Sequence, residues 1–125
     1  YGLSYTTFRY GKARTDKKSY TADESVKLTF TLKNSGAKAG AETVQVYMSQ
    51  KNPSVLRPVK ELKAFKKVYL QPGEEQVVEL EIPVQSFAFY DEGLGDWKLE
   101  TDKYTLHVAS SSRKIHSTAT IEVNN

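Results

Sequence analysis

Apolar and polar residues alternate along much of this chain. Residues 26–32, VKLTFTL, carry Val, Leu, Phe and Leu at every second position, with lysine and threonine between them. This period of two predicts a β-strand with one buried face and one solvated face. Four other segments repeat the pattern, at residues 43–48, 78–82, 104–108 and 119–123.

Shorter strand candidates lie between these segments, at residues 6–10, 66–70, 86–90 and 96–100. Pro72-Gly73 predicts a tight turn, because proline sets the backbone of the second turn position and glycine accepts the positive φ of the third. No segment is typical of a long helix. Seven or more short strands in 125 residues predict an all-β fold, namely an antiparallel β-sandwich, with an up-and-down barrel as the alternative.

One stretch departs from the alternation. Residues 53–65, PSVLRPVKELKAF, place an apolar residue at every third position and contain two prolines. A helix is disfavoured there, because Pro58 has no backbone N–H to donate and its ring restricts Arg57. We therefore expect a long connection that crosses the sandwich. Four apolar residues are expected to hold it against the core: Val55, Leu56, Val59 and Leu62.

Composition excludes several classes of protein. The formal net charge of +3 is small for 125 residues and does not predict nucleic-acid binding; the basic excess is local, at residues 57–67. No apolar run approaches the roughly 18 residues that span a bilayer, so no membrane segment is expected. The chain has no cysteine, which excludes disulfides and thiolate chemistry. It opens on Tyr1 without methionine, which favours a processed or excised piece of a longer protein.

Candidate catalytic and metal-binding residues are few. Glu79 and Glu81 share one strand face, but that face is expected to be open to water, where no pocket raises a carboxyl pKa. His107 and His116 lack nearby ligands of metal-site spacing, and the serines at 110–112 lack a nucleophile motif. No glycine-rich phosphate loop is present. We therefore expect no catalytic residue, no cofactor and no metal in this chain.

Five segments, in order and with matching spacing, resemble a known family: YGLSYTTFRY, LKNSGAKAGAETVQVYMS, PSVLRPVKELKAFKKVYLQPGEE, FAFYDEGLGDWKLE and YTLHVASSS. Together they are similar to the fibronectin type III-like domain at the C-terminus of glycoside hydrolase family 3 enzymes, chiefly β-glucosidases. The likeness runs from Tyr1 to about Val123. It implies an immunoglobulin-like or fibronectin type III-like sandwich, with residues 1–125 forming a single domain.

The resemblance also implies a larger parent protein. In that family the catalytic carboxylates belong to domains upstream of this one, so no catalytic residue is carried over and this chain alone is not expected to be an enzyme. Its expected partners are the upstream catalytic domains of the same polypeptide. The resemblance favours a periplasmic or secreted protein, while the residues themselves leave the compartment open.

The expected role is that of an accessory domain that packs on the catalytic domains and stabilises them. The basic connection is the predicted docking surface, because its apolar and basic residues exceed what a free loop requires. The docking residues are expected to be Arg57, Pro58, Lys60 and Glu61.

The alternative function is a carbohydrate-binding module. Such a module would need aromatic side chains lined up on an exposed face. The candidates for this platform are Tyr47, Tyr69, Tyr90 and Trp97. Strands also favour aromatic residues for packing against their neighbours, so core or cross-strand packing is the competing explanation of these four residues.

Overall fold

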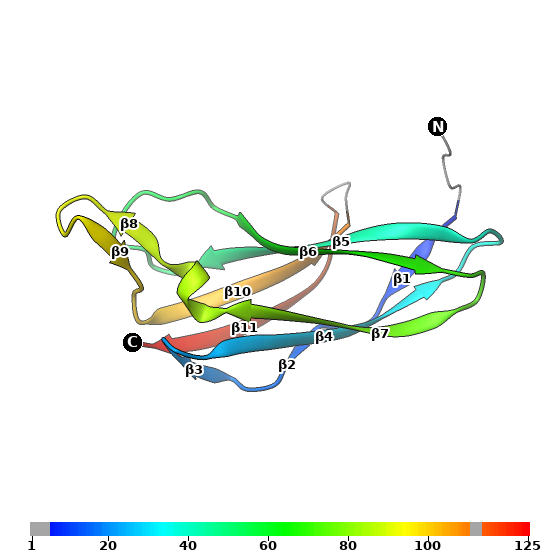
Figure 1. Cartoon of the computed structure of the whole chain (residues 1–125), viewed down its shortest axis with the longest axis horizontal. Coiled ribbons are helices and arrows are strands. Elements are labelled where there is room, and N and C mark those ends of the chain that lie inside the picture. The colour runs from blue at the N-terminus through cyan, green and yellow to red at the C-terminus, as the bar shows by residue number, and fades with distance from the viewer. Residues whose placement is uncertain (1–5, 111–113) are drawn as a thin grey trace.

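The computed structural model describes residues 6–110 and 114–125, which form two facing β-sheets (Figure 1). In the first sheet, the long strand β4 (Ser25–Asn34) pairs antiparallel with three partners: β1 (Phe8–Tyr10), β2 (Arg14–Thr15) and β7 (Glu75–Pro83). The second sheet has the strand order β3 (Ser19–Thr21), β11 (Ile115–Asn124), β10 (Asp102–Ala109), β5 (Gly40–Gln50) and β6 (Glu61–Leu70). Strand β3 joins β11 in parallel, and the other pairs in this sheet are antiparallel.

A small hairpin extends one end of the sandwich, at the left of Figure 1. It consists of β8 (Phe89–Asp91) and β9 (Asp96–Lys98), and it follows the short 3₁₀ helix η1 (Val84–Phe87). The C-terminus and the connection between β5 and β6 lie at the same end of the molecule. The predicted all-β sandwich is confirmed: apart from the β8–β9 hairpin, the described strands form two separate sheets rather than the alternative barrel.

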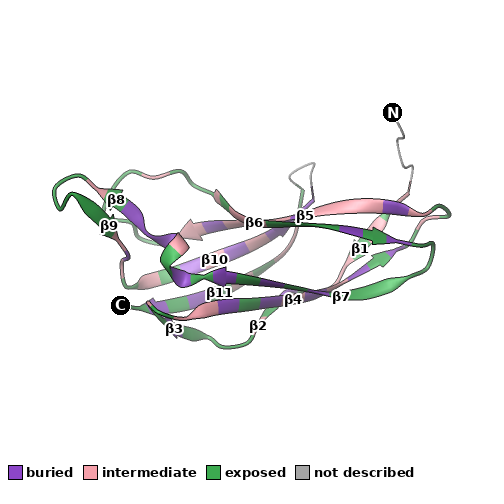
Figure 2. Cartoon of the chain, viewed as in Figure 1, coloured by how far each residue is buried: buried purple, intermediate pink, exposed green. Residues whose placement is uncertain are grey.

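The period-two segments fold as predicted. Along β4 every second residue from Val26 to Leu32 is buried, and the residues between them are exposed or half-buried. Figure 2 shows this alternation on both sheets. The two buried faces meet in one core, in which each fully buried leucine or valine contributes about 1.5–3 kcal/mol of transfer free energy.

The turn at Pro72-Gly73 is also confirmed. Gly73 has a φ of +78°, and the amide of Glu74 donates to the carbonyl of Gln71 at 3.0 Å. The turn joins β6 at the edge of one sheet to β7 at the edge of the other.

Two regions differ from the expected elements. Residues 86–90 were predicted as one strand, but η1 occupies the first part and β8 begins only at Phe89. Here the hydroxyl of Ser86 donates to the carbonyl of Pro83 and turns the chain. Strands β2 and β3 were not predicted, because two or three residues are too few to show a period.

Strand β6 begins at Glu61, well inside the expected connection. Its pairing with β5 contains an irregularity: Ala64 lies opposite Val46 and Leu62 lies opposite Tyr47, so Lys63 is an extra residue. Such a β-bulge shifts the alternation by one position. It therefore places Leu62 and Phe65, three residues apart, on the same outer face.

A stacked pair of rings connects the two sheets along one side. Tyr10 of β1 and His116 of β11 have ring centroids 3.9 Å apart and nearly parallel planes. The hydroxyl of Tyr10 donates to Glu42 at 2.7 Å. The ring nitrogen Nε2 of His116 is buried without a hydrogen-bond partner among the described residues. Burial lowers the pKa of His116, and the positive charge of Lys114 lowers it further while Glu42 acts in the opposite direction.

This pair predicts an acid-sensitive stability. Because the pKa of His116 is lower in the folded chain than the value near 6.5 of an unfolded chain, its contribution is complete above that value and is lost as the pH falls below it. The variant His116→Phe keeps the stacked ring and cannot take up a proton. We expect urea unfolding at pH 7.5 and 5.5 to show a smaller loss of unfolding free energy in the variant than in the wild type.

The pKa of His107 is also lowered by burial, so His107→Phe is the comparison that separates the two histidines. An equal loss of unfolding free energy in the wild type and in His116→Phe would contradict the assignment.

Candidate functional site

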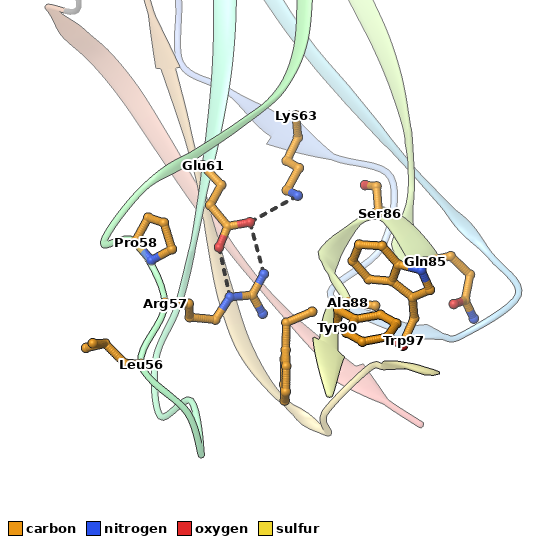
Figure 3. Close-up of a pocket in the computed structure, with 11 residues that line it drawn as sticks. Leu56, Arg57, Pro58, Glu61, Lys63, Gln85, Ser86, Ala88, Tyr90 and Trp97 are labelled. Carbon is orange, nitrogen blue, oxygen red and sulfur yellow. Dashed lines mark hydrogen bonds and ion pairs between the residues drawn. The ribbon is translucent and has the colours of Figure 1, made fainter. Parts of the chain in front are cut away.

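An open groove of about 830 Å³ lies at the hairpin end of the sandwich. We call it the end groove. One wall comes from the connection and the start of β6, with Arg57, Glu61 and Lys63. The other wall comes from η1 and the β8–β9 hairpin, where Trp97 lies below Ser86 in the view of Figure 3 and across from Lys63.

Arg57 fixes the shape of the first wall. Its side chain is only 5% exposed, and its Nε and Nη2 atoms donate to the two carboxylate oxygens of Glu61 at 2.8 and 3.0 Å. Its Nη1 atom donates to Gln50 at 2.8 Å and to the carbonyl of Phe87 at 3.0 Å. The guanidinium also lies over the ring of Phe89, 5.4 Å from its centroid. Arg57 therefore ties the connection to β5, η1 and β8.

Glu61 is shared between two cations. Besides the fork of Arg57, its carboxylate contacts the ammonium of Lys63 at 3.2 Å. Burial alone would raise the pKa of Glu61, but the hydrogen bonds and charges of Arg57 and Lys63 outweigh it and lower that pKa. At neutral pH the three side chains, which we call the triad, hold two positive charges and one negative charge.

Backbone contacts hold the rest of the connection in place. The amide of Asn52 donates to Asp102 at 2.7 Å, and the amide of Ser54 donates to Glu100 at 3.0 Å. The side chain of Gln50 donates to the same Glu100 carboxylate at 3.0 Å. The connection is thus bound to Glu100, which lies between β9 and β10, and to Asp102 at the start of β10.

The predicted burial of the four apolar residues in the connection is wrong. Leu56 is fully exposed, Val59 is 81% exposed, and Val55 and Leu62 are 39% and 47% exposed. The physical reason is that Arg57 takes the inward position and satisfies its donors there, so its neighbours point outward. The bulge at Lys63 then places Leu62 on the outer face of the sheet.

The predicted docking residues divide into two kinds. Pro58 and Lys60 are exposed, whereas Arg57 and Glu61 bind each other at the groove wall. Lys63, Gln50 and Phe89 contribute to this arrangement and were not singled out from the sequence. They come together only through the pairing of β5 with β6 and the return of η1, which leave no local sequence signal.

The four aromatic candidates do not form one platform. Tyr90 and Trp97 face each other across the hairpin, with centroids 5.6 Å apart and planes at 83°. Tyr69 lies near the other end of β6, and Tyr47 is half-buried on β5. Cross-strand packing therefore accounts for the hairpin pair, and both of its rings still remain more than half exposed to solvent.

The groove offers little for catalysis. Within residues 6–110 and 114–125, Glu61 is the one acidic residue lining it, and its lowered pKa keeps it ionised at neutral pH. Glu79 and Glu81 are exposed on β7, as expected. The part of the chain that the structure describes contains no group of three or more His, Cys, Asp or Glu that could hold a metal ion. Among these residues no helix is long and apolar enough to cross a membrane.

The central place of Arg57 in the connection can be tested by unfolding. Arg57→Met removes the bonds to Gln50, Phe87 and Glu61, so we expect a loss of about 3 kcal/mol, typical of breaking a largely buried ion pair. The melting temperature should fall by about 10 °C for a domain of this size. Arg14→Met, on an exposed arginine of β2, is the matched control in thermal unfolding followed by circular dichroism. Equal melting temperatures of the two variants would refute the role given to Arg57.

Comparison with known proteins finds close relatives of this fold and sequence. The chain is 41% identical to the beta-glucosidase BoGH3A of Bacteroides ovatus and 39% identical to the thermostable beta-glucosidase B of Acetivibrio thermocellus, over 98% and 99% of its own length. The crystal structure of the beta-glucosidase from Kluyveromyces marxianus superposes on the whole chain with a TM-score of 0.88 and 39% identity.

The matches cover only a small part of each relative. The chain spans 16% of the length of the two bacterial relatives and 15% of the solved yeast protein. The family described as "Fibronectin type III-like domain" matches residues 42–112, from near the start of β5 past the end of β10. By this match and by its sandwich of two sheets, the chain belongs to the fibronectin type III-like domain family.

Proposed function

We propose that this chain is a non-catalytic accessory domain of a larger glycoside hydrolase of the β-glucosidase type. In this proposal it packs on the catalytic domains of the same polypeptide and stabilises their arrangement. The proposal is supported by relatives that are beta-glucosidases, of which the chain spans about a sixth. The catalytic carboxyl pair then belongs to the remaining part of the polypeptide.

The observation that carries the proposal is the gathering of exposed apolar side chains on the connection and on β6. Four apolar side chains within ten residues of the chain are between 47% and 102% exposed: Leu56, Val59, Leu62 and Phe65. Exposed apolar groups that are close together mark interaction surfaces. Contact with another domain would remove them from water, and the neighbouring basic residues would set the orientation of that contact.

The predicted docking residues have distinct parts in this proposal. Pro58 and Lys60 are exposed and would contact the partner domain directly. Arg57 and Glu61 would not contact the partner domain themselves. Their paired hydrogen bonds would hold the connection in the conformation that exposes Val59 and Lys60.

Association with a catalytic part tests the proposal. The partner is the Bacteroides ovatus beta-glucosidase truncated before the segment that this chain matches. We expect the separate chain to bind the truncated enzyme in isothermal titration calorimetry and to lengthen its half-life at elevated temperature. The double variant Val59→Glu with Lys60→Glu should weaken binding by at least about tenfold, because it places two carboxylates in an apolar and basic contact.

The matched control changes the same residue types on the first sheet. Val77 and Lys33 are exposed on β7 and β4, and Val77→Glu with Lys33→Glu should bind as the wild type does. Absence of binding by the wild-type chain, together with no effect on the half-life, would contradict the proposed function.

A further inference from the structure

Among the described residues that line the end groove, two cations, Arg57 and Lys63, face one carboxylate, that of Glu61. The two oxygens of Glu61 accept from Arg57, and one of them also contacts Lys63 at 3.2 Å. The side chains of Arg57, Glu61 and Lys63 are 5%, 21% and 15% exposed, so the triad is shielded from water. A charge in such a place is costly unless it is paired. The triad, with a net charge of +1, is therefore matched to one further anionic group.

The acidic residues of the hairpin do not supply that group. Asp91, Glu92 and Asp96 lie at or near the hairpin turn, and none of them lines the groove. The carboxylate of Asp91 instead accepts the amides of Gly93 and Leu94 at 2.8 and 3.1 Å. Lys60 is exposed but does not line the groove, and its charge acts on His107 of β10 instead.

The opposite wall is apolar. Trp97 is 65% exposed and Tyr90 is 52% exposed, and both rings line the groove together with the buried Ala88 and Phe89. Tryptophan and tyrosine that are held rigidly at a surface are typical anchors of protein interfaces. At about 830 Å³, the groove has the size of sites that take a few side chains or a small ligand.

We propose that the end groove receives a segment of the catalytic part of the same polypeptide that carries an acidic side chain beside an apolar one. The carboxylate binds Lys63 at the triad, and the apolar side chain packs on Trp97. This assignment rests on the proposed function and names the chemistry of its contact. An acidic side chain of the segment would be complementary in charge to the wall that holds Lys63, and an apolar side chain would pack on the aromatic wall.

A carbohydrate fits the same groove less well. A platform of two aromatic rings needs them side by side in one plane, whereas the exposed rings of Tyr90 and Trp97 stand at 83° to each other. It also needs free hydrogen-bonding groups, but the amide of Gln85 donates to the carbonyl of Ala22 and the hydroxyl of Ser86 donates to the carbonyl of Pro83. A neutral sugar would leave the charge of the triad unpaired.

The test measures binding of groove variants to the same truncated beta-glucosidase by calorimetry. Trp97→Ala should weaken binding by about 30-fold, because it removes the exposed aromatic anchor of the groove. Lys63→Met should weaken binding by about tenfold and reduce its dependence on salt, whereas Lys63→Arg should keep both. Lys103→Met is the control, because Lys103 is an exposed lysine on β10 paired with Glu122.

The outcomes separate this inference from the proposed function. Wild-type binding that is unchanged by Trp97→Ala and by Lys63→Met would overturn the groove assignment and leave the accessory role standing. No binding by the wild-type chain, together with no effect on the half-life of the truncated enzyme, would overturn the accessory role and the groove assignment with it. Electrophoresis of the isolated chain in gels containing soluble β-glucan adds a third comparison. Retarded migration that Trp97→Ala abolishes would identify a sugar site and overturn the peptide occupant.

Discussion

Burial of two apolar sheet faces against each other is the constraint on which the rest of this structure depends. Strand β4 supplies Val26, Leu28, Phe30 and Leu32 to one face, and the second sheet supplies residues such as Val46 and Leu106 to the other. The side chains between these buried residues lie on the outer faces and are exposed or half-buried. The long strands therefore have no freedom to slip by one residue, since a slip would exchange the buried and solvated faces.

At the hairpin end the sandwich is closed by polar contacts instead. The guanidinium of Arg57 takes the place that an apolar side chain would fill. Its hydrogen bonds to Gln50, Glu61 and Phe87 satisfy N–H donors that would otherwise be buried without partners. The consequence is an outward-facing connection. Its apolar side chains, the shielded charge of Lys63 and the exposed ring of Trp97 all lie at this end, which makes it the part of the domain best suited to contact another one.

Whether a feature could be predicted from the sequence depends on how far apart along the chain its interacting residues lie. Alternation is local, so the five strands of period two, at residues 26–32, 43–48, 78–82, 104–108 and 119–123, and the turn at Pro72-Gly73 were predicted correctly. The contacts of Arg57 reach across seven residues to Gln50 and thirty to Phe87, and no local pattern encodes them. The apolar residues at every third position were interpreted as core contacts, whereas Arg57 turns Leu56 outward and the bulge at Lys63 turns Leu62 outward.

The family could be predicted from five ordered segments because they carry the turns and the connection as well as the strands.

The most direct test of the groove uses Trp97, since it is the single tryptophan of the chain. In the chain labelled with 5-fluorotryptophan, the fluorine resonance reports the surroundings of that ring. If Trp97 is buried in the complex, adding the unlabelled truncated beta-glucosidase shifts this resonance and removes its sensitivity to exchange of H₂O for D₂O. A resonance that stays unshifted and solvent-sensitive while the complex forms would contradict the groove assignment.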